Sequence, residues 1–275
     1  MAELLVITGA AGNIGSTLRP RLAKPGRWLR LLDVRPIPPA EPGERIERVE
    51  ASVTDLGALE AAFAGADAVV HLGGFSEERA WEELVEVNIN GTYRVFEAAR
   101  RQGVGRVVFA SSVHAAGFAP RDTGELPDYL FPRPDTNYGV SKVAGEAIGS
   151  LYADRYGLSV VCLRIGYCFE QLSSPDVLAI YLSPDDCASL VEAAISAPAP
   201  GFKVVWGVSR NTRSVLSLAE ARSLGYRPAD DSERHVQTLA QLPDGDPQPA
   251  RRLGGKFCGP EFDTARHQAR SGPTS

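Results

Sequence analysis

Two residues of this 275-residue chain, Tyr138 and Lys142, have the types and the spacing of an acid/base pair. They lie four positions apart at the start of a segment with helical periodicity, so both side chains lie on one face of the expected helix. A free tyrosine has a pKa of about 10, and a nearby ammonium lowers that pKa because it favours the phenolate. The pair therefore suits removal of a proton from an alcohol whose carbon gives up a hydride.

Ser111 and Ser112 follow directly on an apolar run and add a hydroxyl to this pair. Ser112 is placed to hydrogen-bond the same substrate oxygen that Tyr138 would deprotonate, at the carboxyl edge of a sheet where ligands bind. Considered alone, each serine would be interpreted as a turn residue at the end of a strand. Tyr138 and Lys142 alone would be interpreted as two exposed residues of a helix. The order of these residues along the chain, after a glycine-rich turn, favours an active site.

The glycine-rich turn spans residues 9–15, between an apolar run and an amphipathic segment. A side chain at Gly9 or Gly12 would keep a pyrophosphate away from the backbone, and Gly15 lets the helix and strand pack closely. The helix N-terminus adds N–H groups and the positive end of a dipole. The alternative is a tight turn that binds no ligand. The position of the glycine-rich turn between a strand and a helix favours dinucleotide binding instead.

Asp33 ends the second apolar run, about twenty residues after the glycine-rich turn, where a carboxylate accepts hydrogen bonds from the adenosine ribose. This position favours NAD over NADP, because a 2′-phosphate would meet the charge of Asp33. Arg35, two residues later, could accommodate such a phosphate in part. The alternative for Asp33 is a cap of the strand end.

The elements that must position these residues follow from hydrophobic periodicity. Short β-branched runs alternate with helical segments, which predicts an α/β fold: a Rossmann-like, doubly wound parallel sheet with helices on both faces. We expect strands at residues 4–8, 29–33, 46–51, 68–72, 106–111, 159–165 and 203–206. We expect helices at residues 14–22, 56–63, 81–101 with a break near Asn88, 138–156 and 184–196.

The domain organisation follows from the same pattern. Residues 1–165 are expected to form the dinucleotide-binding domain and residues 166–275 a small substrate-binding region and tail, interleaved into one compact unit. Residues 117–137 are polar, proline-rich and long enough for a loop that covers a site. The tail from about Leu242 has no clear pattern, so it is disordered, wraps the body or wraps a partner subunit.

Composition bounds the partners. The net charge of −5 and an ordinary charged fraction argue against a nucleic acid partner. The four cysteines stand far apart without metal-ligand spacing, and the first residues lead straight into a strand. No apolar stretch approaches the roughly 20 residues that span a bilayer. We therefore expect a reduced, cytoplasmic protein with a small-molecule substrate and with no metal, nucleic acid or membrane partner.

Several motifs together resemble those of the extended short-chain dehydrogenases, the NAD-dependent epimerase/dehydratase family, over about residues 3 to 170. They are the glycine-rich turn, Asn88-x-x-Gly91-Thr92, Phe109-Ala110-Ser111-Ser112 and Tyr138-Gly139-Val140-Ser141-Lys142. The resemblance implies that Ser112, Tyr138 and Lys142 form the catalytic triad, with the lysine also holding the nicotinamide ribose, and that the protein is a homo-oligomer. It implies NAD as cofactor, with contacts from Gly9, Gly12, Asn13, Ile14, Gly15, Asp33, Val53, Leu72, Gly73, Gly74, Asn88, Tyr138, Lys142 and Ile165.

Further runs resemble the uronate dehydrogenases, which oxidise the hemiacetal carbon of galacturonate or glucuronate to a lactone with NAD. They are His71-Leu72-Gly73-Gly74, Arg133-Pro134-Asp135, Arg164-Ile165-Gly166-x-Cys168 and Val204-Val205-Trp206-Gly207. The short stretch after Ile165 suits a small substrate rather than a nucleotide sugar. This resemblance implies substrate contacts from Ser76, Ser112, Val113, His114, Tyr167 and Asp176.

Three of those positions depart from the uronate dehydrogenase pattern. Val113 replaces an asparagine, Tyr167 replaces a small serine, and Asp176 replaces an arginine suited to gripping a carboxylate. An acid that faces a substrate carboxylate in a partly desolvated pocket costs on the order of a few kcal/mol. Ser52 also stands where relatives commonly have an aspartate that contacts adenine. We therefore expect a neutral sugar, a polyol or a similar hydroxy compound as substrate rather than a uronate.

Two other functions stay open at this point. A sugar epimerase would return the hydride to its substrate and release no NADH, and a dehydratase would place an acidic pair where this chain has Val113 and His114. A non-catalytic dinucleotide sensor would bind the cofactor without chemistry, but the presence of Tyr138 and Lys142 argues against it. The favoured function is oxidation of a hydroxyl or hemiacetal carbon of a small sugar or sugar acid.

Overall fold

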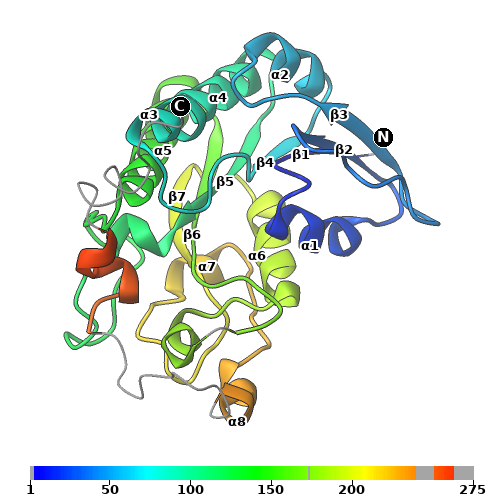
Figure 1. Cartoon of the computed structure of the whole chain (residues 1–275). Helices are drawn as coiled ribbons and strands as arrows, with labels where there is room; N and C mark the ends of the chain where they lie inside the picture. Colours follow the sequence, from blue (N-terminus) through cyan, green and yellow to red (C-terminus); the bar gives the residue numbers. More distant parts are fainter. Residues whose placement is uncertain (1–2, 173, 240–250, 263–275) are drawn as a thin grey trace, which may run out of the picture.

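The computed structural model describes residues 3–172, 174–239 and 251–262, and within these ranges it contains one seven-stranded parallel sheet (Figure 1). The strand order is β3-β2-β1-β4-β5-β6-β7. The strands are β1 Glu3–Thr8, β2 Arg27–Asp33, β3 Ile46–Glu50, β4 Ala68–His71, β5 Arg106–Ser112, β6 Ser159–Ile165 and β7 Phe202–Gly207. The order reverses between β1 and β4, so the loops after these two strands diverge and leave room for a ligand at the sheet's carboxyl edge. The doubly wound α/β fold expected from the sequence is confirmed.

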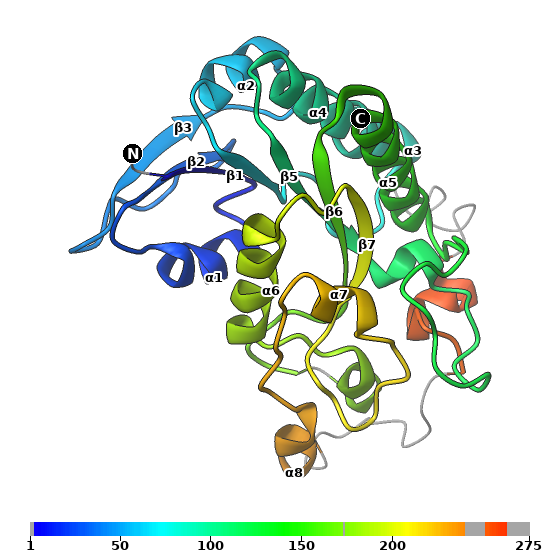
Figure 2. The ribbon, with the colours of Figure 1, turned by 180° about the vertical axis from the view of Figure 1, so that it is seen from behind.

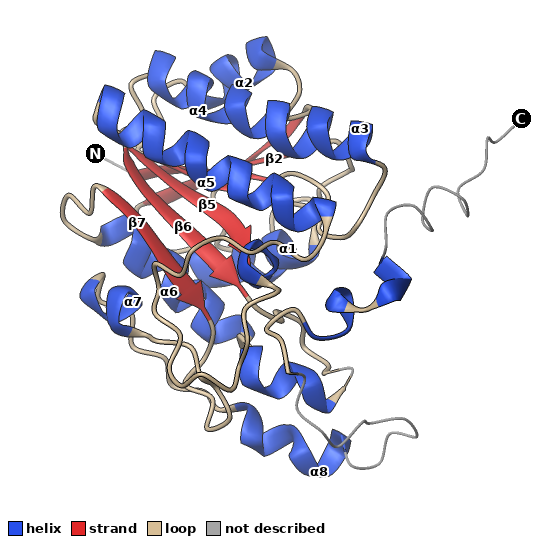
Figure 3. Cartoon of the chain, turned by 90° about the vertical axis from the view of Figure 1, so that its left-hand side faces the viewer, coloured by secondary structure: helices blue, strands red, loops and turns tan. Residues whose placement is uncertain are grey.

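Helices cover both faces of the sheet, as Figures 2 and 3 show from behind and from the side. One face carries α2 (Leu56–Phe63), α4 (Gly91–Arg101) and α5 (Asn137–Tyr156). The other carries α1 (Asn13–Leu22) and α6 (Pro184–Ser196). The short helices are α3 (Trp81–Glu83), α7 (Ala219–Ser223) and α8 (Val236–Leu239).

The helices on the two faces of the sheet form two separate apolar cores with it. Alternate residues of each strand point into one core and into the other. Leu5 and Ile7 of β1 pack toward α1 and α6, whereas Val6 between them packs toward α2, α4 and α5. All three side chains are fully buried. Burial on both faces is the reason that these strands show continuous apolar runs in the sequence.

The expected strands and helices agree with the structure to within two residues at their ends, except in one helix. The break expected near Asn88 is a π-helical segment, Leu84–Asn90, which leads directly into α4. Single π-helical turns inside helices often occur at functional sites. The short 3₁₀ segments Val113–Ala116 and Pro175–Ile180 had no periodic signal in the sequence.

Part of the C-terminal tail packs on the loop of residues 117–137. Leu253 N–H donates to Ala119 O at 3.0 Å and Gly254 N–H donates to Gly117 O at 2.9 Å. The Leu253 side chain is 1% exposed in a third apolar cluster with Val113 and Trp206. Of the alternatives for the tail, residues 251–262 therefore wrap the body (red in Figure 1), while residues 240–250 and 263–275 lie outside the described residues.

Three chemical features of the described residues bear on partners. None of the helices there has both the length and the apolar character to cross a bilayer. In the same part of the chain, no group of three or more His, Cys, Asp or Glu side chains is placed to hold a metal ion. Cys162, Cys168, Cys187 and Cys258 are free thiols.

Candidate active site

The three glycines of the turn between β1 and α1 have different tasks. Gly9 has φ +69°, and a Cβ there would lie 2.7 Å from Gly73 N, so this glycine is required by the fold itself. A Cβ at Gly15 would lie 2.6 Å from Gly9 O, which shows how closely helix and turn pack. A Cβ at Gly12 would instead meet Gly9 O at 3.1 Å and the Arg35 side chain at 3.6 Å. Gly12 is thus the position where a missing side chain leaves backbone open to a ligand.

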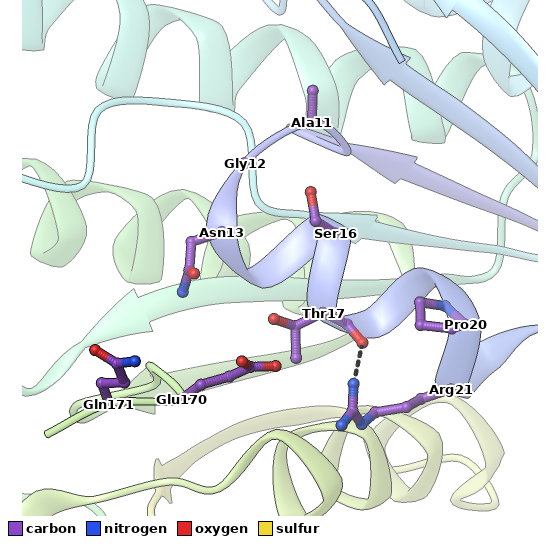
Figure 4. Close-up of a pocket in the computed structure, with 9 residues that line it drawn as sticks. All are labelled: Ala11, Gly12, Asn13, Ser16, Thr17, Pro20, Arg21, Glu170 and Gln171. Carbon is purple, nitrogen blue, oxygen red and sulfur yellow. Dashed lines mark hydrogen bonds between the residues drawn. The ribbon is translucent and has the colours of Figure 1, made fainter. Parts of the chain in front are cut away.

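The first turn of α1 presents backbone N–H groups beside this opening. Gly12 is the N-cap residue and has no side chain to cap the helix, so these donors are available to an anion. The exposed Asn13 donates from Nδ2 to Cys168 O at 2.7 Å and thereby joins the loop after β6 to the turn. A cleft of about 570 Å³ lies here (Figure 4), lined by Ala11, Gly12, Asn13, Ser16, Thr17, Pro20, Arg21, Glu170 and Gln171.

Asp33 at the end of β2 is 6% exposed and holds the turn together. Its Oδ2 accepts a hydrogen bond from Ala11 N–H at 2.9 Å, and its Oδ1 accepts one from Arg35 N–H at 2.9 Å. The strand-end cap that the sequence left as an alternative is therefore present. Lone pairs on the same carboxylate are still available to a ribose hydroxyl, so the two tasks are compatible.

Asn88 clamps the segment that follows β4. Its Oδ1 accepts from Phe75 N–H at 2.8 Å, and its Nδ2 donates to Phe75 O at 3.1 Å and to Ser141 Oγ at 3.0 Å. The π-helical segment aims this 3% exposed amide at both α5 and the strand loop. Val53 packs against the adjacent Gly73, where a Cβ would lie 2.6 Å from Val53 Cγ1. These contacts fix Leu72, Gly73 and Gly74 beside the glycine-rich turn.

The end of β5 and the start of α5 bring Ser112, Tyr138 and Lys142 together. All three are less than 8% exposed, and the Ser112 hydroxyl lies close enough to the phenol of Tyr138 to lower the pKa of that phenol. Lys142 donates from Nζ to Ala110 O at 2.9 Å, with Nζ 5.5 Å from the centre of the Tyr138 ring. The three residues that the sequence singled out therefore meet at one point of the sheet edge.

The N-terminus of α5 is held by two groups. Thr136 is the N-cap residue, and its Oγ1 accepts from Gly139 N–H at 3.0 Å. The Glu78 carboxylate, from the loop after β4, accepts from Tyr138 N–H at 2.8 Å and from Asn137 N–H at 3.2 Å. A negative charge at a helix N-terminus is stabilising. Glu78 was not predicted, because it lies in a polar loop without periodicity.

Burial dominates the protonation of this cluster. It raises the pKa of Tyr138 to about 12; the hydrogen bond from Ser112 lowers that pKa and the charge of Asp135 raises it. Burial also lowers the pKa of Lys142 to about 8. The sequence predicted that Lys142 would lower the pKa of Tyr138, but in this structure desolvation of the phenolate raises it, and the lowering effect comes from Ser112.

His114 lies beside Tyr138, with 5.9 Å between the ring centres. Its Nδ1 is 2.8 Å from Oδ2 of the buried Asp135, and the Phe257 ring of the tail packs against it at 4.4 Å. A proton on Nδ1 that is donated to this carboxylate leaves Nε2 as an acceptor. Sequence reasoning did not assign a role to Asp135 or Phe257. Asp135 stood within a recognised motif, whereas Phe257 lies in a tail that had no pattern.

The remaining predicted substrate residues have different surroundings. The side chain of Val113 is 1% exposed within the third apolar cluster, so its backbone is what a substrate could reach. Ser76 is exposed. Tyr167 donates from its hydroxyl to Gln171 O at 3.1 Å. Asp176 is close enough to Arg121 to raise the pKa of that guanidinium, against the larger lowering by burial.

Ile165, which the resemblance assigned to the cofactor, ends β6 and is 5% exposed. It packs closely against Gly207, where a Cβ would lie 3.0 Å from Ile165 Cα. Ile14 in the first turn of α1 is partly buried against the core. Ile165 therefore lies at the carboxyl edge of the sheet, and Ile14 lies in the helix that follows the glycine-rich turn.

Comparison with known proteins places these features in a family. The NAD dependent epimerase/dehydratase family matches residues 5–169. The chain is 41% identical to uronate dehydrogenase of Pseudomonas putida over 90% of each protein. It is 38% identical to L-arabinose 1-dehydrogenase (NAD(P)(+)) of Haloferax volcanii over 85% of this chain and 99% of that protein.

Solved structures agree with this placement. The structure of a mutated uronate dehydrogenase from Agrobacterium tumefaciens, complexed with NAD, matches with a TM-score of 0.86 at 39% identity, over 93% of this chain and 97% of that one. The match includes the sheet and its carboxyl edge, where the residues described above gather. The chain belongs to the NAD-dependent epimerase/dehydratase family.

Proposed function

We propose that this protein is a dehydrogenase that oxidises the hemiacetal carbon of a small neutral sugar with NAD. The observation that carries the proposal is that the nearly buried Ser112, Tyr138 and Lys142 meet at the carboxyl edge of the sheet, the same edge at which the glycine-rich turn leaves the backbone of Gly12 open. NAD fits the residues present: Gly12 leaves its backbone uncovered, α1 offers free N–H groups, and Asp33 has lone pairs for a ribose.

In this mechanism each residue of the cluster has one task. Ser112 holds the substrate oxygen, and Tyr138 takes the proton from the hydroxyl on the carbon that is oxidised. The ammonium of Lys142, 5.5 Å from the ring centre, favours the phenolate that this step requires. When bound, NAD supplies the acceptor for the hydride that leaves the same carbon. His114 offers Nε2 as an acceptor to a neighbouring sugar hydroxyl.

The charge of Asp176, a position that the resemblance assigns to the substrate, supports a neutral sugar. Asp176 would repel the carboxylate of a uronate, and it already lies close to Arg121. That proximity offsets part of the charge of Arg121, which reduces the attraction of this guanidinium for a second acid. Hydroxyl groups, in contrast, are good partners for a carboxylate and for an imidazole acceptor. Dehydrogenation of L-arabinose, the activity for which the relative from H. volcanii is named, supports the same substrate class.

A uronate is the second candidate, favoured by the similarity to uronate dehydrogenases over most of the chain. The two are separated by incubating the purified protein with NAD and a panel of neutral aldoses and uronates while NADH absorbance is followed. We expect NADH with at least one neutral aldose and little with galacturonate or glucuronate. Brisk oxidation of galacturonate would refute the neutral substrate and leave the dehydrogenase intact.

Two variants test the reaction and the specificity separately. Tyr138→Phe keeps the ring but removes the phenol, so turnover should fall by about 10²-fold or more. Substrate conversion without NADH release would instead indicate an epimerase, and unchanged turnover in Tyr138→Phe would reject the mechanism. Asp176→Arg should shift preference toward uronates, whereas Asp154→Arg, the same change at an exposed position of α5, should not.

A further inference from the structure

Residues 72–80 form the loop between β4 and α3, and two separate contacts attach this loop to α5. The first contact is made by Asn88, which binds both backbone groups of Phe75 and donates to Ser141 Oγ of α5 at 3.0 Å. The second is made by Glu78, whose carboxylate accepts from Tyr138 N–H at 2.8 Å. The loop is therefore fixed to the helix that carries Tyr138 on both sides of residues 76 and 77.

Glu78 supplies an acceptor that the first turn of α5 needs. The first N–H groups of a helix have no partner within the helix. Thr136 Oγ1 accepts from Gly139 N–H, and the carboxylate of Glu78 accepts from the N–H groups of both Asn137 and Tyr138. Hydrogen bonds to a carboxylate are stronger than those to a neutral acceptor, and the positive end of the helix dipole adds to them. This second contact is therefore a firm one.

Ser76 depends on Glu78 more than Tyr138 does. Tyr138 is also held by α5 itself, where Ser141 Oγ donates to Tyr138 O at 2.7 Å. Ser76 is exposed and lies between Phe75 and Glu78, the two residues that attach the loop to α5. A residue two positions from an anchored one stays within about 7 Å of it, because consecutive Cα atoms are about 3.8 Å apart. Glu78 thus determines how close Ser76 lies to the start of α5.

From these contacts we propose that Glu78 is a positioning residue for the substrate, which holds Ser76 beside Tyr138 so that the Ser76 hydroxyl binds the sugar. The inference rests on the proposed function, which places the sugar at Tyr138. Residues 72–74, on the other side of the loop, are held by Asn88 and do not need Glu78. A change at Glu78 should therefore weaken sugar binding and leave NAD binding intact.

Glu77 provides a matched control in the same loop. Its side chain is 62% exposed and pairs with Arg79. The guanidinium of Arg79 in turn lies over the ring of Phe75, with Cζ 5.3 Å from the ring centre. These contacts stay within the loop and do not reach α5. Comparison of Glu77 with Glu78 therefore separates attachment to α5 from a general effect of negative charge in this loop.

The test is a double-variant cycle that compares Glu78→Ala, Ser76→Ala and the variant with both changes. KM and kcat are measured with L-arabinose, or with galacturonate if that sugar is oxidised faster, and the dissociation constant of NAD is measured by calorimetry. We expect KM to rise about tenfold in each single variant, the scale of one hydrogen bond. Because Glu78 acts through Ser76, KM should rise little further in the double variant.

Two further variants distinguish positioning from a general loss of structure. Glu78→Gln keeps one acceptor oxygen for the N–H groups of α5, so it should recover most of the lost sugar affinity. Glu77→Ala should leave KM close to the wild-type value. In all these variants kcat should fall less than KM rises, and the dissociation constant of NAD should stay unchanged, which also reports that the protein is folded.

The outcomes separate this inference from the proposed function. A KM rise in the double variant equal to the product of the two single rises would show that Glu78 acts independently of Ser76 and would overturn the inference. An unchanged KM in Glu78→Ala, or a dissociation constant of NAD that rises together with KM, would also overturn it. All three results leave the dehydrogenase standing. A wild type that forms NADH with no aldose or uronate would remove the proposed function, and this inference with it.

Discussion

Ser111 donates a 2.6 Å hydrogen bond to Oε1 of Glu146, which connects the strand ending in Ser112 to the helix that carries Tyr138. Arg164 of β6 grips the same carboxylate with two hydrogen bonds, of 2.9 and 2.8 Å. A buried network thus joins β5, β6 and α5 directly behind the proposed catalytic cluster.

This network predicts a large loss of stability in Glu146→Gln. Arg164 is 2% exposed, and without the carboxylate its charge would be buried and unpaired, at a cost of about 3–5 kcal/mol. The double variant Glu146→Leu/Arg164→Met should lose less, because no charge is left behind. The free energy of unfolding of both variants is measured by denaturant unfolding. Glu233→Gln, which breaks an exposed pair with Arg213, is the control and should lose far less stability than Glu146→Gln. A similarly small effect at Glu146 would contradict the account.

The sheet and the catalytic motifs were predictable because their signals are local. Parallel strands buried on both faces form continuous apolar runs, as in Leu5, Val6 and Ile7. Tyr138 and Lys142 are one helical turn apart, so their spacing alone places them on one face. The break near Asn88 was predicted but its π-helical form was not, because the sequence from Leu84 to Asn90 suits an α-helix and only the contacts of Asn88 show what the irregular turn achieves.

Contacts set by tertiary packing could not be predicted. Phe257 and Glu78 come from segments without periodicity, and each reaches the cluster only because the chain folds back on it. The protonation of Tyr138 also differed from expectation. The sequence shows that an ammonium is near, but not how fully the phenol is removed from water, and burial decides the pKa here.

His71 predicts a loss of stability in acid. It is 1% exposed between Thr8 Oγ1 at 2.8 Å and Thr92 Oγ1 at 3.1 Å, and burial, with a smaller effect of Lys142, lowers its pKa from 6.5 to about 3. Between these two values the unfolded chain binds a proton that the folded chain does not, so stability falls as pH drops below 6.5.

Urea unfolding at two pH values measures this effect. From pH 7 to about pH 5, the stabilising contribution of His71 should shrink by about 2 kcal/mol. Wild type should therefore lose more stability over this range than His71→Gln. Burial also lowers the pKa of His235, which lies outside the core, so His235→Gln should flatten the slope less than His71→Gln does. Parallel slopes for wild type and His71→Gln would show that His71 does not stay neutral.

The burial of Lys142 predicts that replacing this residue with an apolar one raises stability and lowers activity. Burial lowers its pKa from 10.5 to about 8, so the folded state carries a cost below pH 8 that disappears as pH rises to 10.5. Lys142→Met should therefore be more stable than wild type at neutral pH by on the order of 1–3 kcal/mol, after the loss of the bond to Ala110 O. The gap should narrow above pH 8, and turnover should fall by about 10²-fold or more.

A matched substitution separates this effect from a general benefit of methionine. The pKa of Lys203 is raised, mainly by its hydrogen bond to Glu220, so Lys203→Met should destabilise the protein or leave it unchanged. Thermal unfolding and NADH formation are measured on the same samples. A Lys142→Met protein that is less stable than wild type at every pH would contradict the predicted cost of burying the ammonium.

The hydrogen bonds of Asn88, in the π-helical segment, predict that its replacement weakens both stability and cofactor binding. Asn88→Ala removes three hydrogen bonds in a buried position, which releases Phe75 and the adjacent glycines from α5. Stability should fall by about 2–3 kcal/mol, and the dissociation constant of NAD should rise several-fold. Asn90→Ala, two residues later, removes only a bond to Glu86 and should change NAD binding little. NAD affinity that is the same in both variants would separate Asn88 from the cofactor site.

Phe257 predicts that the tail shapes the substrate side of the site and not the cofactor side. Its ring packs on His114, with 4.4 Å between the ring centres, and His114 in turn lies against Tyr138. Phe257→Ala should let the imidazole turn away from its position, so the KM for the sugar should rise several-fold while the dissociation constant of NAD stays unchanged.

Phe131→Ala, at a side chain that is 81% exposed, is the matched control. Steady-state kinetics with calorimetric NAD binding decides the matter. Because the Asp135 carboxylate still holds Nδ1 in this variant, kcat should fall less than KM rises, and a loss confined to kcat would place Phe257 in the chemical step instead.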